Sequence, residues 1–215
     1  MDTQSAAVPL SADRPHLLRT LGGVGVAAGV LFAAMSVWQH AAGMESGSTG
    51  TAHALDQAGF ALAMVGYVAL IVGVHLARPG GDGKAARFFT ALLAAAWIAF
   101  LAGMAVEAVS SVAPADDALG PIAGLAQGVG LVGLGVTTAR AGRWSGWRRY
   151  APLGLALVYV VVLFVPAIAG WEPNAVTESL WALGYSALGL ALMAEYSRRI
   201  DGSADRLARQ GASSE

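Results

Sequence analysis

The sequence predicts an all-α integral membrane bundle of six transmembrane helices, from its composition, six apolar segments and a one-sided distribution of basic residues. Of the 215 residues, 56% are hydrophobic and only 13% are charged. A soluble globular domain carries roughly 25% charged residues, so this chain has too little polar surface to face water over its whole exterior. Lipid is therefore the expected environment of most of the chain.

Six apolar segments follow one another along the sequence. They cover residues 18–40, 55–77, 88–110, 119–139, 150–169 and 178–196. A helix rises about 1.5 Å per residue, so each segment is long enough to cross a hydrocarbon core of about 30 Å. Only helices satisfy their own backbone hydrogen bonds in lipid over such continuous apolar runs. These segments define a transmembrane domain at 18–196, between short tails at 1–17 and 197–215.

The loops predict the orientation of the bundle. All thirteen Lys and Arg residues lie near the N-terminus, in the second or fourth loop, or in the C-terminal tail. The first, third and fifth loops and the helix ends beside them carry acids instead, namely Glu45, Asp56, Glu107, Asp116, Asp117, Glu172 and Glu178. The positive-inside rule then predicts that both termini are cytoplasmic and that the chain lies in the plasma membrane.

The most basic loop, Arg140 to Tyr150, interleaves arginines with Trp144 and Trp147. Amphipathic rings favour the headgroup level, and basic side chains favour anionic lipid. We therefore interpret this loop as an interfacial anchor with the lipid bilayer as its partner, and expect no nucleic acid.

Short motifs recur between segments. Residues 31–37 resemble 100–106, and residues 66–70 resemble 184–188. The recurrence predicts three tandem helical hairpins, each entering from the same side of the membrane. The alternative is chance similarity between helices rich in Ala, Gly and Leu.

Glycine pairs predict where helices pack closely. Gly25 and Gly29 form one GxxxG pair, and Gly124 and Gly128 form another. Small residues let helix backbones approach each other in lipid, where no hydrophobic force joins helices. Pro166 is expected to kink the fifth helix.

A few polar side chains fall within the apolar segments. Each of these residues is expected to make an interhelical hydrogen bond rather than a substrate contact: Gln57, Tyr67, Gln127, Tyr159 and Tyr185.

The acidic side of the bundle carries the candidate functional residues. We predict a cation site on that side, formed by Glu107, Glu178, Asp56, His40 and His53. Carboxylate oxygens and imidazole nitrogens together suit a divalent cation, and acids also concentrate cations or protons at an entrance. The alternative for Asp56 and Glu178 is that they complement helix dipoles at helix N-termini. Glu107 has no such explanation, because it lies near a helix C-terminus.

The function predicted from these features is a non-enzymatic transport or permeation component, or a membrane subunit of a larger complex. The absence of cysteine excludes disulfides and thiolate metal sites, and no catalytic motif is present. The alternative is a metal- or haem-dependent membrane enzyme that uses the His, Glu and Asp side chains of the acidic side. The sequence requires no cofactor, and the expected protein partner is another membrane protein or a second copy.

Overall fold

The computed structural model describes residues 14–43, 50–109 and 116–212, and the side chains of 16–43, 50–106 and 120–197. The described residues are almost entirely helical. The elements are α1 (Arg14–Ala41), α2 (Thr51–Ala77), α3 (Lys84–Val109), α4 (Asp116–Ala141), a 3-10 turn (Gly146–Tyr150), α5 (Ala151–Val158), a π-helical segment (Tyr159–Phe164), α6 (Val165–Ile168) and α7 (Ala175–Ala212).

Six helical stretches in the described part of the chain are long and apolar enough to cross a membrane, as the sequence predicts. The fifth of them, Gly146–Ile168, is assembled from four consecutive elements. Large apolar side chains also cover the outside of the bundle, including Ile122, Leu157 and Ile168, each more than 60% exposed. Such a surface is stable in lipid and unstable in water.

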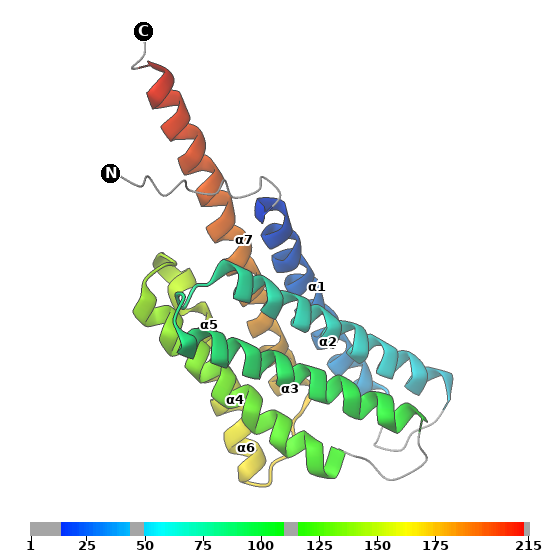
Figure 1. Ribbon diagram of the computed structural model, residues 1–215. Helices are drawn as coiled ribbons and strands as arrows, with labels where there is room; N and C mark the ends of the chain where they lie inside the picture. Colours follow the sequence, from blue (N-terminus) through cyan, green and yellow to red (C-terminus); the bar gives the residue numbers. More distant parts are fainter. Residues whose placement is uncertain (1–13, 44–49, 110–115, 213–215) are drawn as a thin grey trace.

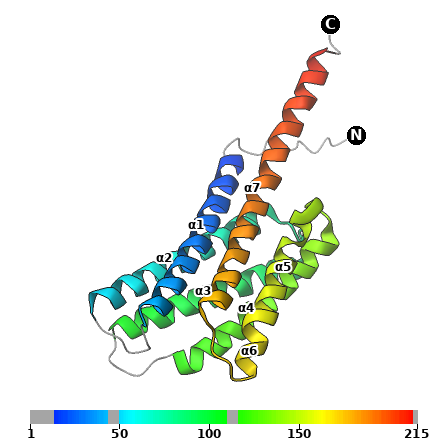
Figure 2. The same ribbon diagram turned by 180° about the vertical axis from the view of Figure 1, so that it is seen from behind.

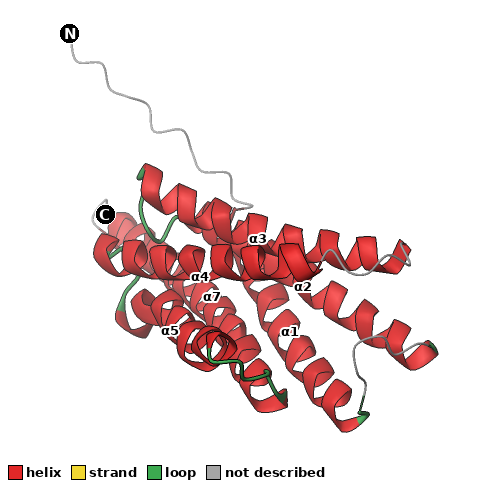
Figure 3. Cartoon of the chain, turned by 90° about the horizontal axis from the view of Figure 1, so that it is seen from below, coloured by secondary structure: helices red, strands yellow, loops and turns green. Residues whose placement is uncertain are grey.

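The helices form a closed ring. Along the ring, α1 packs on α2, α2 on α3, α3 on α4, α4 on α5, α5 on α7, and α7 again on α1. Figures 1 and 2 show α1 and α7 side by side, with α7 continuing past the other helices. In the view of Figure 3, α1 and α5 lie on one side of the bundle and α3 lies on the other.

The contact between α1 and α7 is the most extensive in the bundle. A Cβ atom added at Gly29 would lie 2.5 Å from the carbonyl oxygen of Ala182, and one added at Gly189 would lie 2.6 Å from that of Gly22. The two backbones therefore touch at glycines on both helices.

The other predicted packing glycines face side chains. A Cβ atom at Gly25 would lie 2.7 Å from Leu70 of α2, and Cβ atoms at Gly124 and Gly128 would meet the ring of Tyr159 at 3.3 and 2.9 Å. These glycines admit large side chains from the neighbouring helix rather than its backbone.

The fifth span deviates from a regular helix, as Pro166 predicts. Proline has no N–H group for the helical ladder and crowds the preceding turn. The residues just before Pro166 form a π-helical segment, in which the Val165 N–H donates a hydrogen bond to the Val160 carbonyl. The added width lets the proline continue the span as α6.

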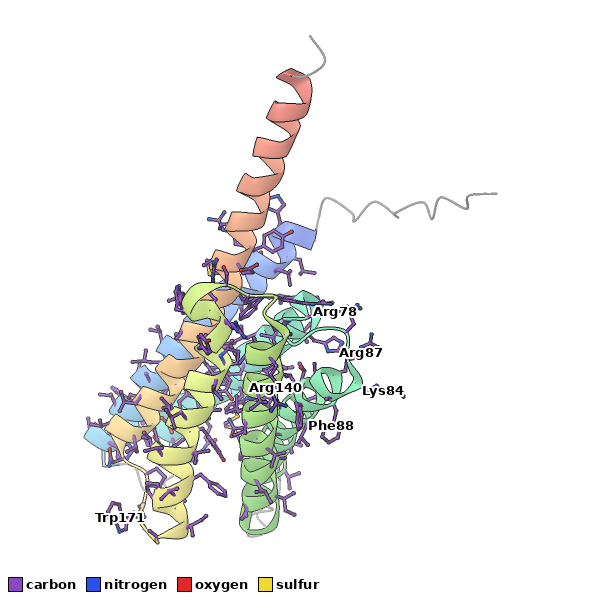
Figure 4. All side chains as sticks on the ribbon, turned by 90° about the vertical axis from the view of Figure 1, so that its left-hand side faces the viewer. Arg78, Lys84, Arg87, Phe88, Arg140 and Trp171 are labelled. Carbon is purple, nitrogen blue, oxygen red and sulfur yellow. The ribbon has the colours of Figure 1, made fainter. Side chains whose placement is uncertain are left out.

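The bundle has two chemically different ends. The end we call basic carries the loops 78–83 and 142–150, and the end we call acidic carries the loop 169–174 and the start of α2. Figure 4 shows Arg78 and Trp171 at these opposite ends. Trp147 is 57% exposed, and its interfacial role stays a prediction. The same interpretation is wrong for Trp144, which is 1% exposed. Trp144 packs into the core of the bundle instead.

Candidate functional site

Aromatic rings fill the centre of the ring of helices. They come from five of the six spans: Phe32, Phe60, Tyr67, Trp97, Phe100, Tyr159, Phe164, Trp181 and Tyr185. The closest pair is Tyr67 and Tyr185, with centroids 4.3 Å apart, and Trp97 stacks on Trp181 at 5.5 Å. In the described part of the chain, aromatic side chains in contact with one another therefore fill the middle of the bundle.

A hydrogen-bond network runs through this aromatic core. The hydroxyl of Tyr185 accepts bonds from Nε2 of Gln127 at 2.9 Å and from Nε1 of Trp97 at 3.1 Å. The hydroxyl of Tyr159 donates to the Gly124 carbonyl at 2.7 Å. These contacts join α3, α4 and α7, and the π-helical segment to α4. The predicted interhelical bonds of Gln127, Tyr159 and Tyr185 are confirmed.

Tyr67 does not follow that prediction. Its side chain is completely buried, yet its hydroxyl oxygen has no hydrogen-bond partner. The ring packs between Phe32, Trp97 and Tyr185, so shape rather than hydrogen bonding fixes its position. An unpaired buried hydroxyl costs about 1–3 kcal/mol, which calls for an explanation beyond packing.

Asp56 is the buried acid of the acidic end. It lies in the second turn of α2, is 1% exposed, and its Oδ1 atom has no hydrogen-bond partner. Ser36 of α1 is also completely buried, with an unpartnered Oγ atom. The expected helix-dipole role does not account for Asp56, because α2 begins at Thr51 and has no acid in its first turn.

The other candidate cation ligands lie closer to the surface. Glu178 is half-buried in the first turn of α7, and His53 is half-buried on α2. His40 is exposed, with Nδ1 2.8 Å from the Ser36 carbonyl oxygen, so this nitrogen carries the proton and donates. The side chain of Glu107 lies outside the described residues.

Among the side chains that the structure describes, no three His, Asp or Glu residues lie together as metal ligands would. The cation site that includes Glu107 stays a prediction. For a haem, the described histidines offer no interior ligand, since His16, His40 and His75 are exposed and His53 is half-buried. An axial ligand has to lie inside an apolar pocket.

Charged side chains link the loops at the basic end. Asp82 accepts hydrogen bonds from Arg143 at 2.6 Å and from Arg78 at 2.8 Å. These two guanidinium groups lower the pKa of the exposed Asp82 carboxyl below its ordinary value. The second and fourth loops are thereby held together.

A buried ion pair lies beside this surface pair. Arg148 donates to the Ala194 carbonyl at 3.0 Å and lies 3.6 Å from Oε2 of Glu195, and both side chains are almost fully buried. Sequence reasoning missed Glu195. The available signal was an acid in the last turn of an apolar span, where an ionisable group is costly without a partner.

Two hollows open sideways from the bundle. One, of about 560 Å³, lies between the acidic ends of α2 and α3 and is lined by His53, Ala54, Gln57, Ala58, Ala61, Leu101, Met104 and Ala105. The other is a groove between α4 and α5, made of adjoining hollows of about 530 and 380 Å³ that share Val132 and Val160. Both sit within spans, so lipid is the medium that reaches them.

No protein-family model matches the chain, and neither a protein of curated function nor a solved structure matches it. The class of protein therefore has to be inferred from the residues and their arrangement alone. The six apolar helices, their lipid-compatible exterior and their shared aromatic core make this chain a multi-pass α-helical membrane protein.

Proposed function

We propose that the chain lies in the plasma membrane with both termini in the cytoplasm, as three tandem hairpins. The orientation rests on the complete segregation of Lys and Arg, all of which fall at the basic end and in the tails. Within each proposed hairpin the two helices contact each other: α1 contacts α2, α3 contacts α4, and α5 contacts α7. Tyr67 and Tyr185, which occupy the same place in the recurring motif, pack against each other with ring centroids 4.3 Å apart.

Reporter fusions test this orientation. Fusions at Gly81 and Ser145 are expected to report the cytoplasm, because both positions lie in loops with basic residues. Fusions at Gly47, Pro114 and Pro173 are expected to report the opposite side. A cytoplasmic signal from any of these three positions would contradict six spans in this orientation.

For function, we propose a non-enzymatic transport or permeation component that moves protons or small monovalent cations. The observation that carries the proposal is Asp56, a carboxyl group buried inside an apolar span with an unpartnered oxygen. An ionised carboxylate without a partner costs several kcal/mol in such a place, so the group is stable only with a proton on it or a cation beside it. Intramembrane acids of this kind mark ion and proton pathways.

The buried polar groups continue from Asp56 towards the centre. Ser36 offers a second unpartnered oxygen near the acidic end, and Tyr67 lies about three turns further along α2, roughly 16 Å away. Gln127 and Tyr185 then continue the polar groups onto α4 and α7. Each of these side chains can form a hydrogen bond with a proton carrier, and each has an oxygen atom that can coordinate a partly dehydrated cation.

Aromatic rings close this route in the described conformation. Phe32 contacts both Phe60 and Tyr67, and Tyr67 packs against Tyr185. We therefore infer a gated pathway rather than an open pore. Tyr67 is the natural moving part, because its hydroxyl has no hydrogen bond to break when the ring rotates.

Flux through proteoliposomes tests the proposal. With a potassium-diffusion potential and a pH-sensitive dye inside, wild-type protein is expected to admit protons faster than empty liposomes do. A separate set, with sodium as the only permeant cation, tests the monovalent-cation alternative. Asp56→Asn keeps the shape and removes the ionisable group, so flux is expected to fall at least tenfold with no loss of thermal stability.

The matched control is Glu172→Gln. It removes an acid from the same end of the molecule, but Glu172 is exposed in a loop and its loss is expected to leave flux unchanged. Flux equal to that of empty liposomes, or flux that Asp56→Asn leaves unchanged, would overturn the transport proposal. A subunit role in a larger membrane complex would then be the better account.

A further inference from the structure

The cleft between α2 and α3 differs from the groove between α4 and α5 in its polarity. His53 and Gln57 lie one turn apart on α2, both half-buried, and line the cleft near its acidic end. The rest of the lining is apolar, contributed by four alanines, Leu101 and Met104. The α4–α5 groove is lined mainly by apolar residues, and its Tyr159 hydroxyl already donates to the Gly124 carbonyl.

The cleft therefore has the polarity of an amphiphile, with hydrogen-bonding groups at the headgroup level and apolar surface below them. Its volume of about 560 Å³ lies within the range of roughly 300–1,000 Å³ that small-molecule sites occupy. Such sites are mainly apolar and carry a few polar groups that orient the ligand. Imidazole and amide N–H groups can both donate, so the matching head carries acceptor oxygens.

The charges around the cleft restrict the kind of head group that a ligand can have. Residues 20–77 and 88–139, which include α2, nearly all of α3 and the loops at their acidic ends, contain no Lys or Arg. A phosphate head at the mouth would find no Lys or Arg side chain at the acidic ends of α2 and α3, and Asp56 lies one turn from His53. A neutral head is favoured over an anionic one. The alanine wall of α2 also lets a flat ring lie close to the helix backbone.

We propose that this cleft binds an isoprenoid quinone, with its carbonyl oxygens at His53 and Gln57 and its chain along Ala58, Ala61 and Leu101. This site faces lipid between two helices, whereas the proposed route through Asp56 lies inside the ring. The inference thus goes beyond the proposed function, and either of the two can fail without the other.

The test uses full-length protein in phosphatidylcholine nanodiscs, titrated with a decyl-substituted benzoquinone by calorimetry. Ala58→Trp fills the cleft from an exposed position, so it is expected to fold normally and weaken binding at least tenfold. Gln57→Leu removes one donor and is expected to weaken binding roughly three- to tenfold. The matched control is Ala95→Trp, on an exposed position of α3 that does not line the cleft, and it is expected to bind like wild type.

Decanol, which has a comparable chain and no carbonyl, is the ligand control and is expected to bind at least tenfold more weakly. Equal binding of decanol would show that the cleft takes alkyl chains without selection, and would overturn the proposal. So would an absence of quinone binding by the wild type, or equal affinities in Ala58→Trp and Ala95→Trp.

Discussion

Replacement of Arg148 by methionine is expected to destabilise the protein by about 3–5 kcal/mol, because it breaks a buried ion pair by removing one partner. The side chains of Arg148 and Glu195 are 13% and 5% exposed. The guanidinium group also donates to the oxygens of Ser145 and to the Ala194 carbonyl, so it ties the fourth loop to α7. Methionine keeps much of the apolar stem and loses every one of these bonds.

Unfolding in mixed micelles, followed by circular dichroism against the fraction of denaturing detergent, measures this loss. Arg143→Met is the matched control, in the same loop and with the same change of side chain. Its partner Asp82 is 50% exposed, so loss of that surface pair is expected to cost about 1 kcal/mol or less. The double variant Arg148→Met, Glu195→Gln should recover part of the loss. Equal losses in the two single variants would show that the buried pair contributes no more than the surface pair.

The six spans could be predicted from the sequence because hydropathy and length act locally. A continuous apolar run in lipid has one solution, a helix, whatever its neighbours are. Each helical stretch begins a few residues before its predicted start, and α7 continues to Ala212 rather than stopping near 196. The hydrogen bonds of Gln127, Tyr159 and Tyr185 were predictable for a similar reason, since a polar group in lipid has to find a partner.

Asp56 and Trp144 were not predictable, because their burial depends on which way a helix or loop faces. An aspartate near the start of an apolar segment commonly serves the helix dipole. Here α2 begins far enough upstream to place Asp56 in the second turn, where its side chain is covered. A tryptophan between arginines commonly lies at the headgroups, yet the fourth loop folds back and inserts Trp144 into the core.

For the candidate site, the sequence predicted which residues take part but not how they are arranged. The sequence places His40, His53, Asp56 and Glu178 near the same ends of their segments, but it contains no information on the distances between them. Asp56 alone among the described candidates proves deeply buried, while His40 is exposed. The aromatic core was invisible for the same reason, because its rings come from spans that are far apart in sequence and meet only in the closed ring.

Replacement of Gly29 by alanine, a change of one methyl group, is expected to cost about 1–3 kcal/mol, as overpacking does at sites that cannot relax. The added Cβ would lie 2.5 Å from the Ala182 carbonyl oxygen and 3.0 Å from the Ser186 backbone nitrogen. Both are backbone atoms of α7, so no rotamer change can make room. The helices would have to separate along their longest contact and stretch the bond from Ser186 Oγ to the Val26 carbonyl, now 3.0 Å.

The control is the same substitution on the same helix at Gly23, where nothing lies within 4 Å of the added atom. Alanine has the higher helix propensity, so Gly23→Ala is expected to be neutral or to stabilise α1 by up to about 1 kcal/mol. Melting temperatures in one detergent should therefore move in opposite directions, or at least separate clearly. Gly128→Ala should fall between the two, since its neighbour is the Tyr159 ring at 2.9 Å, a side chain that can shift. Equal melting temperatures for Gly29→Ala and Gly23→Ala would contradict this prediction. They would show that the α1–α7 contact is looser than the backbone distances indicate, and that small residues do not hold these two helices together.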